Sequence, residues 1–354
     1  MRFPEFSGEW EETELQDIVP NICSGKDRIS NSGEVVLYGS TGVIGRTNSA
    51  SYLENIVLVA RVGANAGQMQ IGNAPCGVTD NTLVIDAKEW NYYIYYFLQH
   101  YNLNRLVFGS GQPLITGGMM KKIKVRYGGK AERDKITNLL YLLDERIATQ
   151  NKIIEDLKLL KSAITDRLYS EVRGTAYTYR QLFDVINERN KDNIYHNVLS
   201  ASQELGMIDR SDINIDIKFE QASIVSYKIV RKGDYVVHLR SFQGGFAFSE
   251  KTGICSPAYT ILRPKDNLMY GYLSYYFTSK QFVKSLNLVT YGIRDGRSIN
   301  VDEWLDMKVV LPKKQEQSHI LNTINSIECK LRNEHEIYSR LIKQKNYLLR
   351  QMFI

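Results

Sequence analysis

A long internal repeat restricts the fold of this chain more than any other feature of its sequence. Residues 120–170 align without a gap with residues 304–354, at an offset of 184 positions. No proline or glycine lies between residues 131 and 172, or between residue 313 and residue 354. Each segment can therefore form one helix of about 40 residues, roughly 60 Å long at 1.5 Å per residue. The repeat predicts two similar halves, each with a long helix.

Both segments carry apolar residues at alternating steps of three and four, which is the pattern of a coiled-coil seam. The first seam consists of Ile136, Leu140, Leu143, Ile147, Gln150, Ile154, Leu157, Lys161, Ile164 and Leu168. The second consists of Ile320, Ile324, Ile327, Leu331, Glu334, Tyr338, Leu341, Lys345, Leu348 and Met352. Two like halves joined head to tail can pair their helices around a pseudo-two-fold axis, so we predict an antiparallel coiled coil. A helical hairpin that only packs a core is the alternative.

The polar seam residues also predict a register, because they are costly to bury without partners. A register that places Lys161 opposite Glu334 also places Gln150 opposite Lys345, so all four side chains would be paired. The competing register, one heptad away, places Glu334 opposite Ile154 and gains apolar overlap. We predict the paired register.

The repeat continues upstream of the helices. Tyr95–Phe97 matches Tyr275–Phe277, and a glycine-rich loop follows each match. Strands are predicted at 35–38, 56–60, 82–85 and 258–262, and helices at 90–101 and 270–284. Residues 175–230 have no convincing counterpart, so the second domain is expected to be more elaborate. The predicted fold class is α+β, with domains at 1–120 and 173–306 and coiled-coil helices at 121–172 and 307–354.

Composition favours an anionic partner and a reducing environment. The chain has 45 Lys and Arg against 39 Asp and Glu, a net charge of +6. Its four cysteines show no Cys-x-x-Cys spacing, which argues against a disulfide framework or a zinc site. There is no signal peptide, and no apolar run reaches the roughly 18 residues that span a bilayer. We expect a soluble, cytoplasmic protein that does not bind membranes.

Motifs for catalysis are missing. The segment Gly39–Gly45 lacks the Gly-Lys-Ser/Thr ending of a phosphate-binding loop and is predicted to be a tight β-turn. The five histidines show no metal-binding spacing, and Gly109–Gly111 is too short for a nucleophile elbow. No Asn-Pro-Pro-aromatic segment for methylating an amino-group base is present. The sequence therefore predicts neither a catalytic residue nor a metal site.

The remaining polar loops suit nucleic acid. Arg, Lys, Asn, Gln and Ser among glycines can approach phosphates closely and present hydrogen-bonding groups to base edges. The candidates in the first domain are Arg46, Arg61, Asn65, Gln68, Ser110, Gln112, Lys121 and Lys122. Those in the second domain are Lys228, Arg240, Gln243, Lys251, Tyr291, Arg294 and Arg297.

Several of these segments resemble the specificity subunit of type I restriction-modification systems, and the resemblance covers nearly the whole chain. They are Arg2–Trp10, Tyr38–Gly45, Ala60–Gly67, Gly109–Ile115 and Lys308–Gln317. Two departures from the family pattern are visible. Residues 124–130 lack a proline equivalent to Pro312, so a looser entry to the first helix is expected, and the second domain lacks the Phe-Pro lead-in.

The resemblance implies a non-catalytic subunit that reads a bipartite target in double-stranded DNA. It also implies two modification (methyltransferase) subunits and restriction (translocase and nuclease) subunits as partners. S-adenosylmethionine, ATP and magnesium would bind those partners and not this chain. Two alternatives stay open: a single-chain nuclease or methyltransferase, and a coiled-coil structural adaptor without DNA binding.

The long helices should set the gap between the two half-sites. One heptad inserted after Leu157 and another after Leu341 would keep the seam and add about 10 Å. We expect both half-sites to be retained and the gap to lengthen by up to about three base pairs, less any effect of DNA bending. Sequencing of methylated bases measures the gap. An unchanged gap with undiminished methylation would show that the helices are not the spacer.

Overall fold

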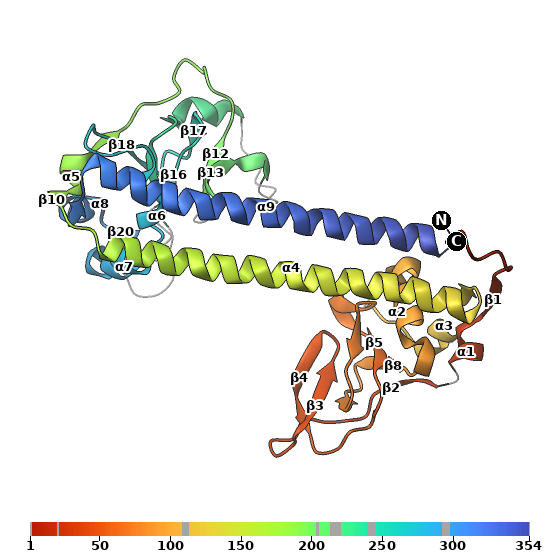
Figure 1. Ribbon diagram of the computed structural model, residues 1–354. Coiled ribbons are helices and arrows are strands. Elements are labelled where there is room, and N and C mark those ends of the chain that lie inside the picture. The colour runs from red at the N-terminus through yellow and green to blue at the C-terminus, as the bar shows by residue number, and fades with distance from the viewer. Residues whose placement is uncertain are drawn as a thin grey trace. The chain divides into compact units, whose positions relative to one another are not determined.

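The computed structural model describes residues 2–19, 21–107, 113–202, 205–212, 221–238, 245–291 and 298–353. The chain forms two compact units, and each contains one domain and a part of both long helices. The first unit comprises Met1–Lys152 with His335–Ile354, and the second comprises Ile153–Glu334. Figure 1 labels the elements of both units.

The domain of the first unit is built mainly on two sheets. A four-stranded antiparallel sheet has the order β2-β8-β5-β6, and a three-stranded sheet has the order β4-β3-β7, in which β3 and β7 are parallel. Strand β1 pairs with β9. The strands are β1 (Glu11–Glu14), β2 (Ile22–Ser24), β3 (Val35–Gly39), β4 (Gly42–Thr47), β5 (Ile56–Ala60), β6 (Met69–Gly72), β7 (Cys76–Val78), β8 (Thr82–Ile85) and β9 (Lys124–Tyr127). The helices are α1 (Leu15–Ile18), α2 (Asn91–Tyr101) and α3 (Gly117–Lys121), with short 3-10 turns at Gly63–Asn65, Lys88–Trp90 and Leu103–Leu106.

Strand β5 forms the centre of this domain, since all five of its residues are buried. Side chains alternate between the two faces of a strand. Val57 and Val59 pack in the cluster that contains the apolar face of α2. Ile56 and Leu58 pack in a second cluster, with β3 and β7. The four-stranded sheet is therefore covered by α2 on one face and by the three-stranded sheet on the other, which explains why β5 is a continuous apolar run.

The domain of the second unit repeats this plan. Its four-stranded sheet has the order β11-β18-β15-β16, and β10 pairs with β21 as β1 pairs with β9. Two-stranded sheets β12-β13, β14-β17 and β19-β20 complete it. The strands are β10 (Thr175–Thr178), β11 (Phe183–Ile186), β12 (Leu199–Ser202), β13 (Gly206–Asp209), β14 (Lys228–Val230), β15 (Tyr235–Val237), β16 (Phe246–Phe248), β17 (Gly253–Cys255), β18 (Thr260–Pro264), β19 (Thr290–Tyr291), β20 (Ser298–Ile299) and β21 (Lys308–Leu311). The helices are α5 (Tyr179–Leu182), α6 (Tyr272–Tyr276), α7 (Lys280–Ser285) and α8 (Val301–Asp306), with 3-10 turns at Arg210–Asp212, Gln221–Ser226 and Leu286–Val289.

The expectation that residues 175–230 have no counterpart in the first half is wrong for residues 175–182. Strand β10 and helix α5 repeat β1 and α1 at a constant offset of 164 residues. Leu15 and Tyr179 occupy the equivalent buried position at the start of the two short helices. The sequence did not indicate this match, because a leucine in one copy is a tyrosine in the other and the loops differ in length.

Other local predictions agree with the structure, with one difference. The predicted turn at 39–45 is the β3–β4 hairpin, and the predicted helix at 90–101 is α2. The segment 270–284, expected to be one helix, is divided into α6 and α7. Ser279 causes the division, since its Oγ accepts a hydrogen bond from the backbone N–H of Phe282 (3.2 Å) and caps a new helix.

The two long helices begin 184 residues apart, as the repeat predicts. Helix α4 spans Lys130–Ser170 and helix α9 spans Lys314–Met352. The ten seam positions of each helix are buried or half-buried. Both helices follow a short strand, β9 or β21, so the segments 121–129 and 307–313 are not part of them.

The expected looser entry to α4 is wrong. Glu132, which is buried, accepts two hydrogen bonds of 2.7 Å from the guanidinium of Arg2. The guanidinium of Arg133 lies over the ring of Trp90, 3.3 Å from its centroid. At the entry to α9, the side chain of Gln317 donates instead to the carbonyl of Pro312 (3.0 Å). Side-chain contacts thus fix the start of α4 without the proline.

The predicted register of the seam is also wrong. In the first unit Lys345 forms an ion pair with Asp144 (2.6 Å), and in the second unit Lys161 forms one with Glu328. Within each unit the paired segments of α4 and α9 run antiparallel, and in both pairs the residue numbers add up to 489. In the predicted register, with Lys161 opposite Glu334, the residue numbers of opposed positions would add up to 495. In the competing register, with Glu334 opposite Ile154, they add up to 488, which is close to the observed sum. Carboxylates beside the seam therefore neutralise its two lysines.

Each long helix ends in an aromatic residue that enters the core of a domain. Phe353 follows α9 and lies 5.4 Å from the ring of Tyr93 and 5.8 Å from that of Phe97, centroid to centroid. Tyr169 near the end of α4 lies 5.5 Å from the ring of Tyr272 in the second unit. Residues 169 and 353 are equivalent in the repeat, being 184 positions apart. The core of each domain is therefore completed by a residue distant in sequence from most of that domain.

We predict that Phe353→Ala destabilises the first unit selectively. The substitution removes a buried ring, which usually costs about 3 to 5 kcal/mol of unfolding free energy. Hydrogen exchange should accelerate in α2 while α6 and α7 stay protected. Phe353→Leu, which keeps an apolar side chain, is the control and should have a smaller effect. Equal acceleration in both units would contradict the prediction.

Candidate nucleic-acid interface

The loops at one end of the four-stranded sheet of the first unit form the candidate interface. Strands β2 and β5 end there and β6 and β8 begin there, because these neighbours are antiparallel. The β3–β4 turn joins the same edge, since Ser40 Oγ donates to the carbonyl of Asn81 (3.0 Å). We call residues 25–29, 40–41, 61–68 and 79–81 the loop edge. Three predicted site residues, Arg61, Asn65 and Gln68, belong to it.

Arg61 lies at the centre of the loop edge and positions other segments. Its Nη1 donates to Ser24 Oγ (3.1 Å), and its backbone N–H donates to the carbonyl of Asn81 (3.0 Å). Its own carbonyl accepts from the N–H of Ile115 (2.9 Å), just beyond the glycine-rich loop. The buried Nε of Arg61 has no hydrogen-bond partner among the described residues. This arginine therefore joins three segments of the domain and keeps one donor unused.

Asn65 and Gln68 are exposed and bonded to each other. Gln68 Nε2 donates to Asn65 Oδ1 (3.1 Å), and the backbone N–H of Gln68 donates to the Asn65 carbonyl (2.9 Å). Gly63 and Gly67 allow this tight loop with φ angles of +77° and +91°. An amide that offers both a donor and an acceptor matches the major-groove edge of adenine. The hydrogen bond and the tight loop thus hold the Asn65 and Gln68 amides in a fixed arrangement on the surface.

The other described candidates of the first domain do not lie at the loop edge. Arg46 is exposed on β4 opposite Val36, and its Nη1 donates to the carbonyl of Glu34. Lys121 and Lys122 lie at the end of α3, whose Gly117 packs against Ile22 at the start of β2. The structure does not bring these three cations together with Arg61.

In the second domain the two described lysines are engaged within the domain. Lys228 Nζ donates to the carbonyl of Tyr259 (2.7 Å), and partial burial lowers the pKa of Lys228. Lys251 forms an ion pair with Asp209, and this hydrogen bond raises the pKa of Lys251. Both side chains therefore already hold elements of the domain together.

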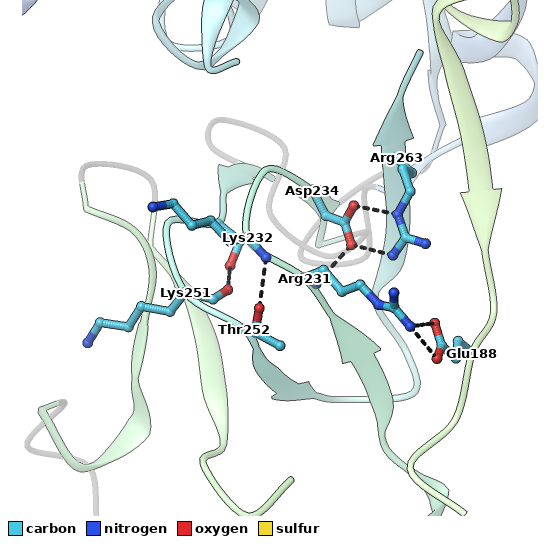
Figure 2. A network of polar contacts seen from close by, with 8 residues as sticks. Glu188, Arg231, Lys232, Asp234, Lys251, Thr252 and Arg263 are labelled. Atoms are coloured by element: carbon cyan, nitrogen blue, oxygen red, sulfur yellow. Dashed lines mark hydrogen bonds and ion pairs between the residues drawn. The ribbon is translucent and has the colours of Figure 1, made fainter. Parts of the chain in front are cut away.

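The sequence reasoning did not identify a polar network around Asp234 (Figure 2). Asp234 is buried and accepts from Arg263 at 2.9 Å through each carboxylate oxygen. It also accepts from the backbone N–H of Arg231 (2.9 Å), whose side chain pairs with Glu188 (2.8 Å). The carboxylate raises the pKa of Arg263. No local motif signals this network, because its members come from three separate segments.

The network fixes the turn that precedes β15. In Figure 2, the side chains of Lys232 and Lys251 extend on the side away from Arg231 and Arg263. The backbone N–H of Lys232 donates to Thr252 Oγ1 (3.1 Å), which ties this turn to the neighbouring one. Asp234 therefore has a structural role in the second domain.

Several predicted site residues cannot be placed. Ser110, Gln112, Arg240, Gln243, Arg294 and Arg297 lie outside the described residues. For Tyr291 only the backbone, in β19, is described. Within the described ranges, no group of three or more His, Cys, Asp or Glu side chains could hold a metal ion. None of the described helices is long and apolar enough to cross a membrane.

Comparisons with known proteins agree with this architecture. Residues 7–159 match the model of the type I restriction modification DNA specificity domain. The chain is similar to the crystal structure of the type I restriction-modification system S subunit from M. genitalium, with 15% identity and a TM-score of 0.62, over 98% of this chain and 96% of that one. A chain from a study of complex assembly and conformational transition of the type I system gives 15% identity and a TM-score of 0.57, over 97% of both chains. The sequence matches none of the curated proteins with which it was compared.

The fold is thus that of a two-domain protein whose repeated α+β domains are joined by antiparallel helices. The family match identifies a type I restriction modification DNA specificity domain in residues 7–159, and the whole chain shares the fold of the two solved structures. The family model covers only the first repeat, and the second repeat has the same strand order.

We predict opposite consequences for two kinds of substitution. Asn65→Ala with Gln68→Ala should reduce discrimination at one position of the first half-site by about 1 to 3 kcal/mol, without lowering stability. Lys228→Met should leave the Tyr259 carbonyl unsatisfied and lower stability by about 1 to 3 kcal/mol, without changing the sequence read. Binding to duplexes with single mismatches and thermal unfolding separate the two effects. If the Asn65 and Gln68 variant retains full discrimination, these amides do not read bases.

Proposed function

We propose that the chain reads a bipartite sequence in double-stranded DNA, with one domain on each half-site. The observation that carries this proposal is the repeat of one domain plan in both units: the same four-stranded sheet order and the same strand pair before a long helix. Two like readers joined by helices of fixed length suit a target made of two parts at a fixed spacing. The family match supports the role in DNA sequence specificity.

The loop edge supports direct reading of bases. It presents the amides of Asn65 and Gln68 on a rigid loop, at the end of a sheet that is buried on both faces. The net charge of +6 favours approach to a polyanion. In this proposal phosphates supply most of the affinity, and base edges supply the specificity.

We further propose that the chain carries no catalytic site and serves as the scaffold for two modification subunits and for restriction subunits. Helix α4 supports this role, because it exposes Leu142, Ile153, Leu159 and Leu160, with Leu159 exposed to 71%. Apolar side chains in such numbers on a solvated helix suit docking of another protein. S-adenosylmethionine, ATP and magnesium are proposed to bind the partner subunits, and the proposed location is the cytoplasm.

Two alternatives give different results in simple assays. A single-chain nuclease or methyltransferase would turn over DNA when the purified chain is given magnesium or S-adenosylmethionine. A structural adaptor without DNA binding would give no salt-dependent shift of a duplex. The proposed function requires a salt-dependent shift and no turnover by the chain alone.

We predict that exchange of residues 1–120 for the first domain of another family member changes one half-site and leaves the other intact. The physical reason is that the two domains have separate cores. The exchange must keep the contacts that Phe353 and Arg133 make with α2 and Trp90, or the hybrid will lose stability for a different reason.

Sequencing of methylated bases in cells that carry the hybrid and its modification subunit measures the outcome. The unmodified chain is the control. A simultaneous change of both half-sites would show that the domains do not read independently.

A further inference from the structure

We propose that each domain contacts the DNA backbone through a short loop in which two outward cations flank one inward polar anchor. The loops are Lys26-Asp27-Arg28, shortly after β2, and Arg189-Asn190-Lys191, shortly after β11. We call them the anchor loops. The inference rests on the proposed function and assigns phosphate contacts to four residues that sequence reasoning did not single out.

The anchor of the first loop is Asp27. Its Oδ2 accepts from the backbone N–H of Val78 (2.8 Å), and its Oδ1 accepts from Ser51 Oγ (2.7 Å). The backbone N–H of Asp27 donates to the carbonyl of Val78 (2.9 Å). At Gly25 a Cβ would lie 2.2 Å from the same carbonyl oxygen, so only glycine permits this close approach. The carboxylate is thus used inside the domain, and the loop is held against β7.

Because Asp27 is held inward, its two neighbours face solvent. Lys26 and Arg28 are exposed and line a concavity of about 460 Å³ at the loop edge, together with Thr79 and Asp80. Neither side chain has an ion pair or hydrogen bond with another described residue. Lys251, in contrast, is neutralised by Asp209. The first anchor loop therefore keeps two positive charges that no described residue neutralises, at the same loop edge as Arg61.

The second loop has the same plan with a different anchor. Asn190 is 1% exposed; its Nδ2 donates to the carbonyl of Tyr195 (2.8 Å), and its Oδ1 accepts from the N–H of Tyr195 (3.1 Å). The backbone N–H of Asn190 donates to the carbonyl of Tyr227 (2.9 Å). Arg189 and Lys191 on either side are exposed, and their side chains form no ion pair with the described part of the chain.

The repetition of this plan points to phosphates and not to bases. The two domains are expected to read different half-sites, so residues that read bases should differ in chemical type between them. A pair of exposed cations that both domains share fits the part of the ligand that is the same in every sequence, which is the sugar-phosphate backbone. Each charge that neutralises a phosphate releases counterions, so the salt dependence of binding reports the number of such charges.

The test uses the full chain with Lys26→Gln and Arg28→Gln, and separately with Arg189→Gln and Lys191→Gln. Binding to a duplex that holds the methylated target and to a scrambled duplex is measured at several salt concentrations. We expect the slope of log K against log salt to fall by about one for each phosphate-binding cation that is removed, so by up to about two for each double variant. The preference for target over scrambled duplex should stay unchanged.

The matched control removes two exposed lysines elsewhere, Lys308→Gln with Lys313→Gln, and should keep the slope of the unmodified chain. A further variant, Asp80→Asn, should have the opposite effect on affinity. It removes a negative charge from the concavity beside Lys26 and Arg28 and should strengthen binding to both duplexes. Thermal unfolding verifies that every variant is folded.

Each outcome decides between the two proposals. If the unmodified chain binds no duplex, the proposed function fails, and this inference fails with it. If the unmodified chain binds and the loop variants keep its slope, only the inference is overturned. A loss of preference at one half-site with an unchanged slope would show that the loops read bases, which also overturns it.

Discussion

The packing of α4 against α9 is the constraint on which each unit depends. A helix of about 40 residues with one apolar seam is not stable alone in water, because most helical stability in proteins comes from burial of an apolar face. In each unit a part of α4 provides the partner for a part of α9, and an aromatic residue near a helix end completes the domain core. Domain and helix therefore stabilise each other. Because the sequence repeats at an offset of 184 residues, both units have the same arrangement of domain core and paired helices.

Buried or half-buried polar anchors position the surfaces that the domains present to solvent. Asp27, Asn190 and Asp234 direct their side chains inward and use their hydrogen-bonding capacity on backbone groups, one serine and one arginine. A buried polar group is tolerated only when it is paired, so each anchor fixes the geometry of its turn. The cations next to the anchors are held outward at little further entropic cost, because the backbone that carries them is already ordered.

The heptad pattern predicts where the two long helices lie but not the register in which they pair. The heptads located both helices, since the 3.5-residue period is a local property of the sequence. The register needed knowledge of residues outside the seam: Asp144 and Glu328 lie beside it and neutralise Lys345 and Lys161. A heptad pattern contains no information on these flanking carboxylates, which reach the same ammonium groups as a seam partner would.

The sequence by itself determined the repeat, the two long helices, the central strand β5, the hairpin turn after β3 and the resemblance of several segments to specificity subunits, because each depends on periodicity or on contiguous residues. Only the tertiary structure decided which loops meet at one edge, that Lys228 serves the interior of its domain, and that β10 and α5 repeat β1 and α1. Those features arise from contacts between residues distant in sequence. The sequence alone does not distinguish Lys228, which donates to a carbonyl 31 positions away, from a lysine that is free to contact a ligand. Only the fold distinguishes the two.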